Sequence, residues 1–277
     1  MLRRDPPLLA KGIDLLAAAA ELASELAVKD PTARGFTSAM AYLRLGQAQA
    51  ESGNHAEATT NLQYAANALD VLVELTPEED PDRGPTEHFL ASALVSLGDS
   101  CQMLEHWEPA TTALDRAIAL RHRMTEQSPG EPFATWFLIK ALQSKARLLE
   151  QVDKLDEATL SLNDALRNAQ MLADLTADDE EWAEPAGDLL GVIQGDFGNL
   201  SALKGRTDDA IKHYEEALKY WEARHTRHPE RPSGALLMQI GSSLTEILIE
   251  MGLDDRAQQV RRIVQETLDQ QEDDKQT

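Results

Sequence analysis

The chain has 277 residues, of which 42% are hydrophobic and 5% aromatic, and its formal net charge is −22. Such acidity argues against nucleic acid as a partner, because phosphate binding needs a basic protein face, and equally against an anionic membrane surface. The acidity serves either to keep a large solvated surface soluble or to attract a basic partner.

The cysteine content and the N-terminus bear on the compartment of the protein. The single thiol, Cys101, cannot form a disulfide within the chain. Lys11 and Asp14 interrupt the apolar region that follows Arg3 and Arg4, which does not match a signal peptide. No apolar run approaches the ~18 residues that a membrane-spanning helix needs. We therefore expect a cytoplasmic protein.

Apolar residues recur at helical spacing along nearly the whole chain, and no segment predicts a strand. The spacing predicts an unpaired first helix over residues 6–29, which Asp30-Pro31 ends. Loops rich in proline and acidic residues, such as 77–85, then separate successive helical hairpins. The acidic tail, 272–277, is expected to fray. We expect the hairpins at about 33–75, 86–126, 133–175, 183–227 and 235–271, within one repeat domain over 1–277.

A pattern of small residues returns in successive hairpins. Two small residues twelve positions apart are followed, four positions later, by a large apolar residue. Small residues allow two helices to approach closely. Copies that stay in phase indicate a solenoid, in which each hairpin packs on its neighbours. The pairs are Gly46/Ala58, Gly98/Ala110, Ala146/Ala158 and Gly198/Ala210, followed by Leu62, Leu114, Leu162 and Tyr214.

This pattern resembles the tetratricopeptide repeat (TPR). In that family a Leu-Gly pair in the first helix and a glycine in the turn precede a series of alanines in the second helix. Leu45-Gly46 and Gly53 match these features, Gly205 matches the turn glycine, and the third copy has Asp153 there instead. The resemblance implies an all-α, right-handed α-solenoid of stacked antiparallel helical hairpins. Because the copies are 48 to 52 residues apart instead of the usual 34, we expect longer second helices.

No set of residues predicts a catalytic centre, a metal site or a cofactor. The seven histidines are scattered over turns and helix ends. His225 and His228 are three residues apart and could share a metal, but the arginines around them would repel a cation. Both histidines also suit the negative C-terminal end of a helix. No glycine-rich phosphate loop follows a strand. We therefore expect a protein that is not an enzyme.

A polar residue follows each close-packed position of the first helices. In the TPR family this place faces the concave groove, which implies that these residues, with neighbours one turn away, bind a protein or peptide segment. The alternative is a merely solvated face. Asn199 also matches an asparagine with which chaperone-binding members hold a C-terminal carboxylate, although the other groups of that clamp do not recur here. The predicted groove residues are Gln47, Asp99, Lys140, Gln143, Arg147 and Asn199.

The first helix carries leucines on more than one face. A capping helix needs a single apolar row, and Leu8, Leu15, Leu22 and Leu26 form a further row beside it. An uncovered row of this kind usually marks an interface. We therefore expect this N-terminal edge to dock a second copy of the chain or an upstream domain. The alternative is that the helix tilts to hide both rows against Tyr42 and its neighbours.

These patterns leave two functions open. The leading one is a non-catalytic protein–protein interaction scaffold that binds a protein segment in its concave groove. The other is a regulatory or sensor module of a larger bacterial signalling assembly, docked through its N-terminal edge. Long repeats of this kind resemble those attached to caspase-like protease, kinase or STAND-type NTPase domains. The two functions differ in whether groove residues or the first helix would contact the partner.

Overall fold

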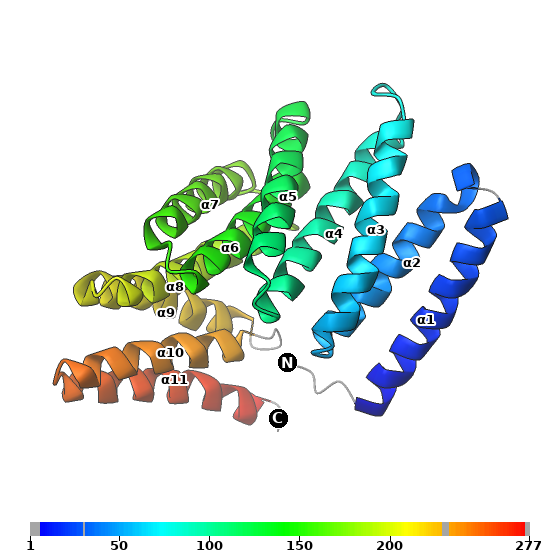
Figure 1. The fold of residues 1–277 in the computed structure, drawn as a ribbon. Helices are drawn as coiled ribbons and strands as arrows, with labels where there is room; N and C mark the ends of the chain where they lie inside the picture. Colours follow the sequence, from blue (N-terminus) through cyan, green and yellow to red (C-terminus); the bar gives the residue numbers. More distant parts are fainter. Residues whose placement is uncertain (1–5, 30, 229–232, 275–277) are drawn as a thin grey trace. The chain divides into compact units, whose positions relative to one another are not determined.

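The computed structural model describes residues 6–29, 31–228 and 233–274, and the side chains of residues 10–28, 34–228 and 233–269. The described residues form helices and no strand, so the predicted all-α fold is confirmed (Figure 1). The helices are α1 (Pro6–Lys29), α2 (Pro31–Glu51), α3 (His55–Leu75), α4 (Arg83–Met103), α5 (Trp107–Gln127), α6 (Pro132–Gln151), α7 (Leu155–Leu175), α8 (Ala183–Leu203), α9 (Thr207–Arg227), α10 (Gly234–Glu250) and α11 (Asp254–Asp274).

The helices belong to two compact units, residues 2–152 and residues 153–277. In the first unit each helix from α1 to α6 packs against the next one in the sequence, and α4 also contacts both α2 and α6. In the second unit α7 to α11 pack in the same consecutive way, and α9 also contacts α11. Consecutive packing of helical hairpins is the arrangement of an α-solenoid.

Glycines of the first helices let the two helices of a hairpin approach closely. A Cβ atom at Gly46 would lie 2.6 Å from Cγ of Leu62, and one at Gly98 would lie 2.7 Å from Cγ of Leu114. Both leucines are fully buried, so neither has free space to move into. The role predicted for these small residues, close helix packing, is confirmed.

Left-handed backbone residues form the turns inside the hairpins. Gly53, Gly205 and Gly252 have φ angles of +86°, +68° and +72°. The same conformation is held by Glu105 and by Asp153, both with φ of 59°. In each of these turns except that of Asp153, the amide of the residue after the left-handed one donates a hydrogen bond. Its acceptor is the carbonyl of the residue five positions before that amide. Such a hydrogen bond ends a helix, and glycine is the residue that most readily adopts the left-handed conformation that it requires.

The lengths of the helices correct one expectation. The second helices α3 and α5 have 21 residues each, but the first helices α2 and α4 have 21 residues as well. The added length is therefore shared by both helices of a hairpin. This is physically reasonable, because each helix can bury its apolar stripe only along a partner of similar length.

Candidate binding groove in the first unit

Two adjoining pockets lie in the first unit, along α2, α4 and α6. The polar pocket has a volume of about 560 Å³ and includes Gln47, Glu51, His55, Asp99, Arg147 and Gln151 in its lining. The aromatic pocket has a volume of about 640 Å³ and includes His88, Phe89, Phe133, Trp136, Phe137 and Lys140. Gln47 and Ser96 line both pockets, so together they form one surface, which we call the groove.

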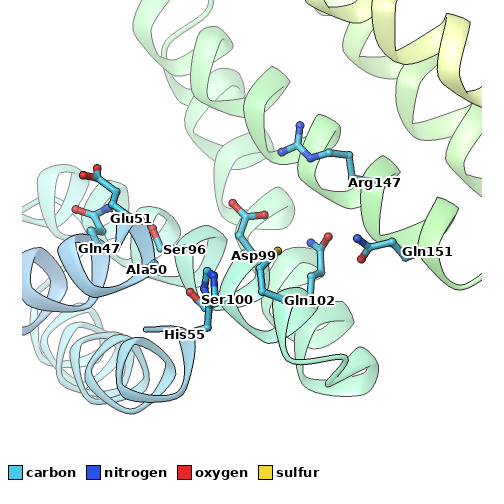
Figure 2. Close-up of a pocket in the computed structure, with 11 residues that line it drawn as sticks. Gln47, Ala50, Glu51, His55, Ser96, Asp99, Ser100, Gln102, Arg147 and Gln151 are labelled. Atoms are coloured by element: carbon cyan, nitrogen blue, oxygen red, sulfur yellow. Dashed lines mark hydrogen bonds between the residues drawn. The ribbon is translucent and has the colours of Figure 1, made fainter. Parts of the chain in front are cut away.

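Three of the predicted groove residues line the polar pocket. Gln47 comes from α2, Asp99 from α4 and Arg147 from α6, and Figure 2 shows Asp99 and Arg147 on neighbouring helices across the pocket. Gln47 Nε2 donates to Ser96 Oγ over 3.2 Å, and an Arg147 Nη donates to Ser144 Oγ over 3.0 Å. These internal bonds orient the side chains toward the same hollow. Whether they contact a partner stays a prediction.

Asp99 and Arg147 form the electrostatic centre of the polar pocket. Burial raises the pKa of the Asp99 carboxyl, while the positive charges of Arg147 and Lys140 and a hydrogen bond from Ser144 act in the opposite direction. A carboxylate offers acceptors and a guanidinium offers donors. The polar pocket can therefore satisfy both the amide and the carbonyl groups of an extended peptide.

The other predicted groove residues have different surroundings. Lys140 lines the aromatic pocket, with its Nζ 5.7 Å from the centre of the Trp136 ring. Gln143 is only 1% exposed, so its side chain lies within the helix packing and not on the surface of the groove. Asn199 belongs to the second unit, where its Oδ1 accepts a hydrogen bond of 2.6 Å from the hydroxyl of Tyr214.

The aromatic pocket was not predicted from the sequence. Phe133 and Phe137 lie on one face of α6, with their ring centroids 4.6 Å apart. The ring of His88, from α4, stacks on Phe133 at 5.3 Å and meets Phe137 edge-on at 4.8 Å. The four-residue spacing of the two phenylalanines was the available signal. The contribution of His88 depends on how α4 packs on α6, which periodicity does not report.

A buried arginine from α5, Arg121, supports this cluster of rings and is only 1% exposed. Its Nη1 donates to His88 Nδ1 over 2.8 Å, and its Nη2 donates to Ser92 Oγ over 2.7 Å and to the carbonyl of His88 over 3.1 Å. Its guanidinium carbon lies 4.6 Å from the centre of the Phe137 ring. Burial lowers the pKa of Arg121 to about 10. Burial and the neighbouring Arg121 also lower the pKa of His88 to about 4, so this imidazole is neutral at physiological pH.

The N-terminal edge is the other surface that the sequence predicted. On α1, Leu15 is 65% exposed and Leu22 is 58% exposed, whereas Leu26 is half-buried. The side chain of Leu8 lies outside the described residues. The helix packs against α2, so one of its faces is covered while these two leucines face solvent.

Two further findings concern metals and membranes. Within residues 6–29, 31–228 and 233–274, no group of three or more His, Cys, Asp and Glu side chains could hold a metal ion. In the same part of the chain, no helix combines the length and the apolar character needed to cross a membrane.

Comparisons with known proteins identify the fold. By sequence, neither a protein-family model nor a curated protein matches this chain. By structure, it is similar to BtubC (BKLC) from P. vanneervenii, with a TM-score of 0.67 and 17% identity over 94% of this chain and 90% of that one. It is also similar to the nearly identical TPR-like repeats of a putative kinesin light chain from Podosopora anserina, with a TM-score of 0.51 and 16% identity over 82% of this chain and 93% of that one. The chain therefore has the fold of the TPR-like helical repeat proteins.

Proposed function

We propose that the chain is a non-catalytic interaction scaffold that binds a segment of a partner protein along the groove of its first unit. The observation that carries this proposal is the convergence of Gln47, Asp99 and Arg147 on one pocket. That pocket offers donors and acceptors to a peptide backbone, and the adjoining aromatic pocket offers a site for a side chain. Polar groups that fix orientation beside an apolar pocket are what a specific binding site needs.

Site-specific crosslinking tests this proposal directly. A photoreactive benzoylphenylalanine is placed at Gln47 or at Gln151, both in the polar pocket, and at Gln63 as a control on the exposed face of α3. After irradiation in an extract of the source cells, we expect the two groove positions to crosslink to the same protein. The control position, Gln63, should not crosslink to that protein. A partner captured through Gln63 but not through Gln47 or Gln151 would move the binding surface away from the groove.

Affinity measurements then quantify the contribution of the polar pocket. With the captured partner purified, Gln47→Ala combined with Arg147→Ala should weaken binding by more than about 1 kcal/mol, as expected for anchors that donate hydrogen bonds. Isothermal titration measures the loss, and unchanged helicity by circular dichroism shows that the fold is intact. An affinity equal to that of the wild type would contradict the proposed site.

A second candidate function uses the N-terminal edge, because Leu15 and Leu22 are well exposed on α1. In this proposal the chain is a regulatory or sensor module of a larger signalling assembly and docks through that edge. Light scattering at several concentrations, on the wild type and on Leu15→Glu/Leu22→Glu, tests it. Self-association that the two charges abolish would support an interface on α1. A wild type that stays monomeric and gains no solubility from the two charges would argue that the edge is not an interface.

A further inference from the structure

We infer that the aromatic pocket receives an acidic segment of the partner protein, with an apolar side chain of that segment against the rings and an adjacent carboxylate at the rim formed by Arg44 and Lys140. This inference rests on the proposed function of the groove and names the chemistry of its ligand. It reverses the expectation from overall charge, by which so acidic a chain would attract basic partners.

The charged side chains that line the aromatic pocket are all cationic. Arg44 on α2, Arg121 on α5 and Lys140 on α6 line it, and neither aspartate nor glutamate does. The chain has 48 acidic residues and only 26 Lys and Arg, so a pocket lined at random would carry more acids than bases. The excess of positive charge is therefore local to this pocket, and it favours a negatively charged ligand.

Arg121 is the most informative of these cations because it is buried without a counter-charge. Among the described residues, no carboxylate forms an ion pair with its guanidinium, which bonds only to neutral acceptors. Buried charges are usually paired, because removing an ion from water is costly. The nearby acid Glu87 is already engaged by Arg83 and Arg123, each at 3.1 Å. A partner carboxylate at the rim would supply the missing negative charge.

Arg121 also lines the aromatic pocket, with its guanidinium carbon 4.6 Å from the centre of the Phe137 ring, so its positive charge adds to that of the rim cations. Electrostatic interactions are stronger and longer in range in a protein interior than in water. A ligand carboxylate therefore need not touch Arg121 and can bind at the solvent-exposed Arg44, whose Nη1 donates to Gln47 Oε1 over 3.3 Å, and at Lys140. The two rim cations belong to α2 and α6 and line the same pocket, so positive charge is brought to it from two helices.

The wall of the pocket determines the apolar part of the ligand. Phe133 is 46% exposed although it contacts Phe137 and His88, so its ring presents an uncovered surface to the pocket. Because the pKa of His88 is lowered to about 4, that ring is uncharged at neutral pH and does not repel an apolar group. Aromatic walls favour aliphatic or aromatic side chains, because burial of such a side chain removes its apolar surface from water.

Selection of random displayed peptides tests this inference. A phage-displayed library is selected on the wild-type protein, on Arg44→Glu/Lys140→Glu, and on a control, Lys212→Glu/Lys219→Glu, which changes the net charge equally on exposed positions of α9 outside the groove. We expect the wild type and the control to enrich peptides with Asp or Glu next to a large apolar residue. The rim variant should not enrich them.

An enriched peptide is then measured by fluorescence anisotropy. Reversal of both rim charges should weaken its binding about tenfold or more, and replacing its acidic residue by the amide should do the same. Enriched peptides without acidic residues, or an affinity unaffected by Arg44→Gln/Lys140→Gln, would overturn this inference while leaving the groove function standing. No enrichment on the wild type would overturn both, which distinguishes the two failures.

Discussion

The close crossing of α4 and α5 makes a quantitative prediction for Gly98→Ala. The added Cβ would lie 2.7 Å from Cγ of Leu114, 3.0 Å from its Cδ2 and 3.4 Å from the carbonyl oxygen of Ala110. Leu114 is fully buried, so it can yield only by straining its neighbours. Overpacking of this kind costs about 1–3 kcal/mol, and the better helix propensity of alanine returns about 1 kcal/mol. We expect a net destabilisation of up to about 2 kcal/mol.

The same substitution elsewhere in the chain provides a matched control. Gly12 also lies inside a helix, α1, but a Cβ atom there would meet nothing within 4 Å. Gly12→Ala should therefore stabilise the chain by about 0.5–1 kcal/mol through helix propensity alone. The opposite signs at Gly12 and Gly98 separate packing from propensity.

A double-mutant cycle identifies the clashing partner. Leu114→Ala alone should cost about 2–5 kcal/mol, because it leaves a cavity in the core. In the background of Gly98→Ala it should cost less, with a coupling of about 0.5–3 kcal/mol between the two sites. Whole urea unfolding curves should be compared, because repeat arrays need not unfold in two states. A Gly98→Ala variant as stable as Gly12→Ala, or zero coupling with Leu114, would refute the assigned crossing.

Three other predictions follow from the structure. Glu105→Gly should raise the urea midpoint by relieving the left-handed backbone, by up to about 1 kcal/mol, whereas Glu105→Ala, which keeps a Cβ, should not. The pKa of His88 falls from 6.5 in the unfolded chain to about 4 in the folded one, so between these two pH values only the unfolded state takes up the proton. The free energy of unfolding should therefore decline as the pH drops from 6.5 to about 4. His88→Gln should flatten this decline, as measured by urea titrations at several pH values. Arg224→Met should cost about 1–3 kcal/mol in thermal or urea unfolding, because the partly buried carboxylates of Glu184 and Asp188 lose their shared cation. An unchanged midpoint would show that this ion cluster is dispensable.

Local chemistry explains why the helical architecture was predictable. Gly46 and Gly98 recur in phase with the alanines and leucines that they pack against. Because a helix crossing has no room for a larger side chain, small residues at a fixed spacing indicate the crossing in the sequence. The left-handed conformation of a turn residue was predictable only where the residue is glycine. Gly53 and Gly205 signal a left-handed residue, but Glu105 holds the same conformation without any such signal. Tertiary packing imposes that conformation against the local preference of the residue.

The sequence by itself determined which residues repeat along the first helices, and so it predicted Gln47, Asp99 and Arg147 as one polar line. Helical register suffices for that prediction, because each of the three follows a close-packed small residue. Register could not show that Gln143 is buried, since burial depends on the neighbouring helices. Only the tertiary structure brought Arg121 of α5 beneath the rings of α4 and α6, because a buried charge and its surroundings are set by contacts between helices far apart in the sequence.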